Sequence, residues 1–304
     1  MTEGTSPAAP ALPRRGRALG WLAGIASVYL LALWYLDRDK HVLSRLGDLA
    51  GPLAVCALLV LCSYLLRYQR WHVLLRVQGH PVASWRAGLV AYLAGFAFTA
   101  SPGKAGELLR IRYFSRLGIP SRATLATFVY ERGLDLAVIT LLGTGAAGLV
   151  PLFGALTGIV MVLLVGLCLL AAWPRLQALA RAVIARLPGP RVRQLCGFLL
   201  DGVCGLRPLL RPGLTLASTA YGAAAWLLTA AAFAWLCHCL GIALSFVPGG
   251  VGTTEAAIVL MLTSTGAGLE VAVAAAIGIR LASLWLAVVV GMLAMGSLEA
   301  RPDP

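Results

Sequence analysis

Four charged residues stand inside stretches of the chain that are otherwise apolar. Glu131, Arg132 and Asp135 fall in the apolar run 123–149, and Arg280 falls in the run 271–298. A charge at the centre of a membrane helix costs roughly 2.5–3.5 kcal/mol on insertion scales, so such residues are rare and usually functional. Two interpretations stay open: ion pairs that lock helices together, such as Glu107 with Arg132, or a polar path that opens and closes.

A pattern of Pro, Gly and Glu occurs twice. The first copy reads PGKAGE at 102–107 and the second PGGVGTTE at 248–255. Each glutamate precedes one of the intramembrane arginines by 25 residues, because Glu107 is followed by Arg132 and Glu255 by Arg280. The candidate residues of the two motifs are Pro102, Gly103, Gly106, Glu107, Pro248, Gly249, Gly250, Gly252 and Glu255.

Pro and Gly break helices, and irregular backbone at membrane depth persists where it lines a cavity or is buried in protein. A break just before a helix also leaves backbone amides that suit an anionic group such as phosphate. The other interpretation of each motif is a helix break needed for packing. Arg110 follows the first motif on a short amphipathic stretch, which is typical of an interfacial helix and also places an arginine where it can hold a lipid phosphate.

The composition indicates which elements carry these residues. The chain has 304 residues, of which 60% are hydrophobic and 12% charged, against about 45–50% and about 25% in soluble domains. A helical crossing needs about 20 apolar residues. The sequence therefore predicts an all-α, polytopic membrane helix bundle. Its apolar runs are 18–36, 49–66, 87–100, 123–149, 152–173, 213–244, 256–265 and 271–298.

Basic residues between these runs predict the topology through the positive-inside rule. Residues 1–17 form a polar tail expected to be disordered and cytoplasmic, 18–298 the membrane domain, and 299–304 a C-terminal tail. Segments 67–86 and 104–122 carry several arginines and are expected inside. The run 87–100 lies between them and is too short to cross, so it is predicted to be re-entrant. Segment 174–212, with seven arginines, is predicted to be a cytoplasmic, partly helical loop.

Segment 245–270 carries no Lys or Arg and is expected outside. The first motif then faces inside and the second outside, which is the signature of an inverted-topology repeat with broken helices and a site near the midplane. The second copy is shorter. Gly79 precedes Pro102 by 23 residues, whereas Gly241 precedes Pro248 by 7. The sixteen missing residues correspond to the run 87–100 and its edges.

Several kinds of function are not favoured. The net charge is +13. The arginines that produce it lie between apolar runs, where the positive-inside rule places them, so nucleic acid is not an expected partner. Cys237-His238-Cys239 lacks a second ligand pair at zinc spacing, so no metal site is predicted. No catalytic motif is found, so no catalytic residue, enzymatic activity or cofactor is assigned.

At these motifs the sequence resembles the lysylphosphatidylglycerol synthase transmembrane-domain family, also called flippase-like integral membrane proteins. The matching stretches are SPGKAGELLRIR (101–112), YERGLDL (130–136) and SFVPGGVGTTEAAI (245–258), followed by Arg280. The resemblance implies a multi-pass protein of the bacterial inner membrane that moves an anionic or aminoacylated phospholipid, or a polyprenyl-phosphate lipid, between leaflets. No soluble synthase domain follows before Pro304, so lysyl transfer is not expected.

Membrane lipids, anionic ones in particular, are thus the expected partners. An accessory subunit or enzyme that modifies polyprenyl-phosphate-linked glycans or lipids is the alternative. A third interpretation is a remnant that no longer transports, because the second repeat is short.

Overall fold

The structure is a computed structural model that describes residues 27, 50–99, 107, 109–147, 151–240, 258–259, 262–263 and 266–300. Helices make up nearly all of these residues, and no strand occurs among them. The predicted all-α membrane helix bundle is therefore confirmed. The predicted inverted repeat stays a prediction, because its second motif lies outside the described residues. The chain divides into two compact units, which are described separately.

Unit 1 comprises Met1–Arg14, Gln69–Gly88 and Leu108–Ala220. Its helices are α5 (Leu109–Arg116), α6 (Ser121–Ala147), α7 (Pro151–Ala172), α8 (Pro174–Ala185), α9 (Pro190–Cys204) and the short 3₁₀ helix η3 (Arg207–Leu209), together with the ends of α3 (Ala50–Val77) and α10 (Pro212–Cys239) that belong to this unit.

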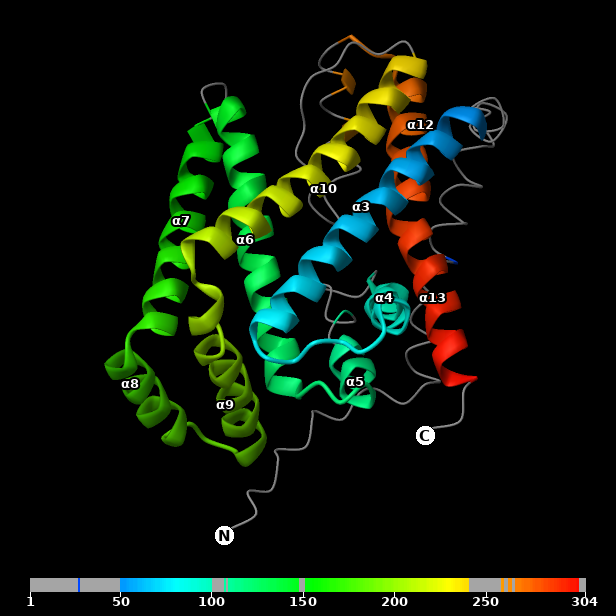
Figure 1. The fold of residues 1–304 in the computed structure, drawn as a ribbon. Helices are drawn as coiled ribbons and strands as arrows, with labels where there is room; N and C mark the ends of the chain where they lie inside the picture. The colour runs from blue at the N-terminus through cyan, green and yellow to red at the C-terminus, as the bar shows by residue number, and fades with distance from the viewer. Residues whose placement is uncertain are drawn as a thin grey trace. The chain divides into compact units, whose positions relative to one another are not determined.

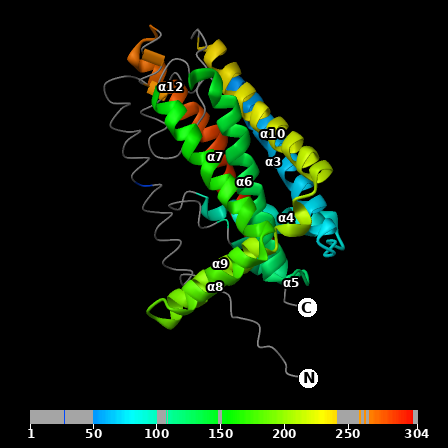
Figure 2. The ribbon, with the colours of Figure 1, turned by 90° about the vertical axis from the view of Figure 1, so that its left-hand side faces the viewer.

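The long helices α6 and α7 run side by side, and α5, α7 and α9 all contact α6 (Figures 1 and 2). A buried apolar cluster around Leu74, Ala126, Tyr130 and Leu209 holds this arrangement. The turn between α5 and α6 needs Gly118, whose φ of 77° is unfavourable for other residues. The core of unit 1 thus lies along one face of α6, the helix that carries three of the predicted site residues.

Segment 174–212, predicted to be a partly helical loop, contains α8, α9 and η3. Pro174 and Pro190 each occupy the first turn of their helix, where proline loses no hydrogen bond and its fixed φ suits the helix. Two of the prolines that interrupt the segment therefore begin its helices.

Unit 2 comprises Arg15–Tyr68, Leu89–Glu107 and Tyr221–Pro304. It contains the first part of α3, the end of α4 (Trp85–Ala94), the 3₁₀ helix η1 (Gly95–Phe98), the second part of α10, α12 (Leu269–Arg280), the π-helix η4 (Leu281–Trp285) and α13 (Leu286–Glu299). The α3 and α10 portions pack together, since the Cys56 thiol donates a hydrogen bond to the Ala232 carbonyl at 3.1 Å. α13 packs against η1 at Gly291, where the two backbones approach closely.

Among the residues that the structure describes, three helical stretches are long and apolar enough to cross a membrane: Ala50–Val77, Pro212–Cys239 and Leu269–Glu299. A fourth is added if Thr157–Ala172 and Pro174–Ala185, bent by 98° at their junction, are counted as one span. The protein is therefore multi-pass, as predicted. Apart from residue 27, the run 18–36 lies outside the described residues, and the orientation of the N-terminus stays a prediction.

Three of the predicted apolar runs can be compared with the helices that contain them. The predicted run 49–66 continues as helix to Val77, so Arg67 and Arg70 belong to α3 and not to a segment after it. The run 271–298 contains a π-helix directly after Arg280, a feature that is frequent at functional sites. The run 87–100 appears as α4 and η1, too short to cross, and its re-entry into the membrane stays a prediction.

Candidate functional site

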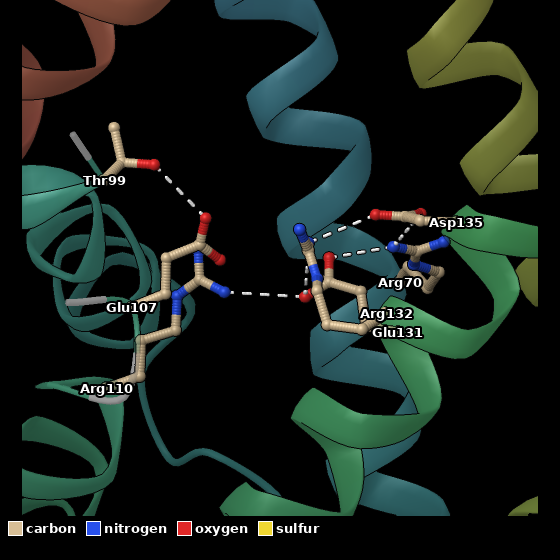
Figure 3. A network of polar contacts seen from close by, with 7 residues as sticks. All are labelled: Arg70, Thr99, Glu107, Arg110, Glu131, Arg132 and Asp135. Carbon is tan, nitrogen blue, oxygen red and sulfur yellow. Dashed lines mark hydrogen bonds and ion pairs between the residues drawn. The ribbon is translucent and has the colours of Figure 1, made fainter. Parts of the chain in front are cut away.

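The centre of unit 1 is a buried network of charged residues, drawn in Figure 3. Glu131 and Asp135 are four residues apart on α6, so their carboxylates lie on the same face of the helix. Nη2 of Arg70, from α3, lies 2.8 Å from Oε1 of Glu131 and 2.8 Å from Oδ1 of Asp135. All three side chains are buried. One guanidinium thus binds two carboxylates that successive turns of α6 provide.

Arg110 reaches the Glu131 carboxylate from α5. Its Nη1 lies 3.5 Å from Oε2 of Glu131, and its guanidinium stacks over the Trp71 ring at 5.1 Å from the centroid. α5 is positioned by apolar side chains on both sides of Arg110, because Leu109, Ile111 and Phe114 are buried. A guanidinium over a Trp face is stabilised by the ring quadrupole. Arg110 is therefore held in place by a charge and by a ring, with 1% of its side chain exposed.

Arg132 completes the network and is its most accessible member. Its Nη2 lies 3.4 Å from Oε2 of Glu131 and 3.1 Å from Oδ2 of Asp135. Of its side chain, 28% is exposed, whereas those of Arg70 and Glu131 are 1% exposed. We call Arg70, Arg110, Glu131, Arg132 and Asp135 the charge cluster. Glu131 is shared by all three of its arginines.

Burying such a cluster costs desolvation free energy, so its charges are stable only together. The penalty for removing two charges from water is offset only if they lie close together and make further hydrogen bonds. Guanidinium groups, which stay ionised and present several donors in one plane, bind carboxylate and phosphate equally well. The cluster can therefore bind a phosphate where a guanidinium is accessible, and Arg132 meets that condition.

Glu107 belongs to unit 2 and is described there. Its side chain is buried, and its Oε1 accepts a hydrogen bond from the Thr99 hydroxyl at 3.3 Å (Figure 3). Thr99 follows η1, so the short apolar run supplies a partner for the first motif's glutamate. Sequence reasoning did not single out Thr99.

Arg280 also belongs to unit 2. It is the last residue of α12 and lies directly before the π-helix η4. The hydroxyl of Tyr64, on α3, donates a hydrogen bond to the Ser283 carbonyl inside this π-helix at 3.0 Å. The irregular part of the helix after Arg280 is thus tied to α3 by a side chain.

The predicted site residues therefore fall into three groups. Arg110, Glu131, Arg132 and Asp135 are brought together in the charge cluster. Glu107 and Arg280 are described in unit 2. The other predicted residues, Pro102, Gly103, Gly106, Pro248, Gly249, Gly250, Gly252 and Glu255, lie outside the described residues.

Sequence reasoning missed Arg70, the arginine that binds both carboxylates. It was assigned to a cytoplasmic segment because it follows the apolar run and has basic neighbours. Trp71 beside it is fully buried. A signal was available in the sequence: Tyr64, Tyr68 and Trp71 continue the helical spacing of apolar residues beyond residue 66.

Comparison with known proteins gives one match. No curated protein and no solved structure matched the chain. The family model described as the lysylphosphatidylglycerol synthase TM region matches residues 20–291, which include every member of the charge cluster. The match covers most of the chain and agrees with the resemblance at the sequence motifs. The protein is thus an integral membrane protein that contacts membrane lipids and is linked to lipid handling, and it belongs to the lysylphosphatidylglycerol synthase TM region family.

Proposed function

We propose that this protein translocates a phospholipid with an anionic or aminoacylated headgroup, or a polyprenyl-phosphate lipid, between the leaflets of the bacterial inner membrane. These lipids share a phosphate group, and we propose that the charge cluster is the site that binds this phosphate. The observation that carries the proposal is the position of Arg132, which is partly exposed while the carboxylates beside it have other arginine partners.

The arrangement allows phosphate to bind without leaving a buried charge uncompensated. Arg132 contacts Glu131 and Asp135, and both carboxylates also bind Arg70. If a phosphate takes the Arg132 guanidinium, the carboxylates keep the Arg70 partner at 2.8 Å. When the phosphate leaves, the carboxylates receive Arg132 again. The exchange lowers the barrier to moving a charged headgroup, because each charge keeps a partner of opposite sign.

The other predicted residues have proposed roles along the path on which this phosphate-binding site lies. The Pro-Gly motifs would supply broken helices along the path, and Arg280 would be the counterpart of Arg132 in an inverted repeat. The π-helix after Arg280 gives that position an irregular backbone. These roles rest on the matched 25-residue spacing in the two halves of the sequence.

The proposal is tested by leaflet exchange in proteoliposomes. The probe is phosphatidylglycerol with a fluorescent acyl chain, and exchange is measured by reduction of the fluorophore from outside the vesicle. Wild-type protein is expected to expose most of the inner-leaflet probe, and Arg132→Gln is expected to slow exchange at least tenfold. Since the tested side chain is partly exposed, this variant is expected to fold.

The matched control is Arg122→Gln. Arg122 also lies on α6 and pairs with a carboxylate, Asp201, at 3.0 Å, but 65% of its side chain is exposed. This variant is expected to exchange lipid at the wild-type rate. Equal rates for Arg132→Gln and wild type would remove the charge cluster from the path. Absence of exchange by wild-type protein, for both phosphatidylglycerol and a polyprenyl phosphate probe, would contradict translocation itself.

A further inference from the structure

Two helices of unit 1 carry the same exposed apolar pattern outside the charge cluster. On α8 the exposed side chains are Leu176, Leu179 and Val183, and on α9 they are Val192, Leu195 and Leu199. Both sets have the spacing i, i+3, i+7, which places each set on one narrow face of its helix. Leu179 is 61% exposed. Leucine and valine exposed in ordered rows on adjacent helices indicate a surface that is covered in the cell.

Arginines flank both rows. Arg175, Arg181 and Arg186 accompany the row on or just after α8, and Arg191 and Arg193 flank the row on α9; all five are exposed. Arg181 makes one long contact with the Cys204 sulfur, at 3.7 Å. α8 contains no acidic residue, and Asp201 near the end of α9 pairs with Arg122. The covering partner is therefore expected to be apolar and to carry negative charge.

The direction of α8 relative to α7 is that of a helix at a membrane surface. α7 has 22 residues without a charge, or about 33 Å at about 1.5 Å per residue, which matches a hydrocarbon core of about 30 Å. Ile159, Val162 and Leu169 form an exposed row on α7. The chain then turns by 98° into α8. With α7 across the bilayer, α8 runs along its surface, as the pair of helices in Figure 2 illustrates.

The residue at this turn supports the same placement. Trp173 lies between the two helices and is 54% exposed. Tryptophan is enriched at the headgroup level of membranes, where its ring is apolar and its N–H finds polar partners. The turn itself is fixed by Gln177, whose side-chain amide donates hydrogen bonds to the Leu170 and Ala171 carbonyls at the end of α7. The bend is therefore held by side-chain contacts.

We propose that the α8–α9 hairpin is a docking surface for the anionic phospholipids of one leaflet. Its two apolar rows insert among the upper acyl chains, Trp173 marks the headgroup level, and the flanking arginines bind lipid phosphates. Amphipathic helices with an apolar row and basic flanks bind membranes in this way. This inference does not depend on translocation, because it rests on the exposed rows, the bend and the charge of unit 1 alone.

The test compares two neighbouring positions on α8 in the full-length protein. In a background with the seven native cysteines changed to Ala, Leu179→Cys and Ala178→Cys are labelled with an environment-sensitive fluorophore in phosphatidylglycerol-containing vesicles. Both positions are exposed, but they lie about 100° apart around the helix, so only position 179 belongs to the apolar row. The label at 179 is expected to be quenched by lipids brominated near the headgroup and to be shielded from aqueous iodide. The label at 178 is expected to be quenched by iodide and not by the brominated lipids.

Two outcomes would overturn the proposal. Equal quenching of both labels by iodide would place the hairpin in water. Shielding of position 179 from both quenchers would mean that protein covers the row, and energy transfer between labelled copies would then identify a second copy of this chain as the occupant.

The preference of the α8–α9 hairpin for anionic over neutral lipid is tested separately, in vesicles of neutral phosphatidylcholine that contain increasing amounts of phosphatidylglycerol. A single Arg→Gln change at Arg175 or Arg193 is expected to reduce the preference of the hairpin for anionic lipid roughly fivefold, since a basic residue near an anionic surface contributes about 1 kcal/mol. Gln194→Ala, which changes an exposed side chain on α9 without changing its charge, is the control and is expected to leave the preference unchanged. An identical response of all three variants to phosphatidylglycerol would contradict the role of the arginines.

Discussion

Nη2 of Arg70 and Oε1 of Glu131 lie 2.8 Å apart in a place where both side chains are 1% exposed. The two residues are 61 positions apart in the chain, so this ion pair joins the end of α3 to the middle of α6. A pair so deeply buried is stable only as a pair, because either charge alone would lose its hydration without compensation. Arg70 therefore fixes α3 to α6 and also holds the carboxylates in position for Arg132.

Removing one partner of this pair is expected to destabilise the protein strongly. Glu131→Gln is expected to lower the free energy of unfolding by about 3–5 kcal/mol, since it removes the carboxylate that Arg70, Arg110 and Arg132 share. Arg70→Gln is expected to lower it by less, because both carboxylates keep their contact with Arg132. The measurement is the midpoint of unfolding in detergent. Arg122→Gln breaks a more exposed pair, between α6 and Asp201 of α9, and is expected to change stability by about 1 kcal/mol or less.

The double variant Arg70→Gln/Glu131→Gln separates this explanation from general damage to the core. The Arg70–Glu131 contact is lost in each single variant and only once in the double variant, so the loss is expected to be smaller than the sum of the two single losses. Strictly additive losses would mean that the two side chains do not depend on each other.

The second prediction concerns the stacking of Arg110 on Trp71. Arg110→Lys keeps the positive charge but loses the planar group that both stacks on the ring and reaches Glu131. The rate of lipid exchange is therefore expected to fall severalfold, although the substitution keeps the charge. Trp71→Leu, which keeps Arg110 and removes the ring, is expected to have an effect in the same direction, measured as the exchange rate in vesicles. Full activity of both variants would show that the stacking is not needed.

The sequence was a good guide where local periodicity determines the outcome. Glu131 and Asp135 are four residues apart, and helical geometry alone predicts that they share a face. Apolar run lengths likewise predicted the all-α membrane bundle. Arg70 was not predictable in the same way, because a basic residue after an apolar run has the same sequence signature whether it lies at the membrane surface or in the protein core.

The Arg-rich segment 174–212 illustrates a second limit. Its prolines and arginines predict a partly helical loop but not where its helices begin, and the prolines at 174 and 190 each begin a helix. The apolar rows at Leu176 and Val192 repeat with helical spacing and could have revealed this. The 98° bend at Trp173 could not have been predicted, because it depends on the Gln177 side chain binding carbonyls of the preceding helix.

The third prediction concerns packing in unit 2. A Cβ at Gly291 would lie 2.2 Å from the Ala97 backbone nitrogen and 2.5 Å from the Phe96 carbonyl carbon. Because these are backbone atoms, Gly291→Ala must push η1 away from α13 and is expected to lower the free energy of unfolding by about 1–3 kcal/mol. Gly296→Ala, on the same helix with no atom within 4 Å of its Cβ, is expected to be neutral or to stabilise the protein by up to about 1 kcal/mol. Thermal unfolding of the two variants in the same detergent makes the comparison, and equal stability of both would contradict the close approach.

The last prediction concerns the π-helix that follows Arg280. The Tyr64 hydroxyl donates a hydrogen bond to the Ser283 carbonyl, so Tyr64→Phe removes one contact while keeping the ring that packs against Phe96. The free energy of unfolding is expected to fall by about 0.5–1.5 kcal/mol, and amide hydrogen exchange is expected to speed up at 281–285 more than elsewhere in α12 and α13. Tyr221→Phe, on α10 of the same unit, is the control, and it is expected to leave exchange at 281–285 unchanged. If Tyr64→Phe left exchange at 281–285 as slow as in the wild type, the π-helix would be held by its own backbone bonds, and α3 would not control the segment next to Arg280.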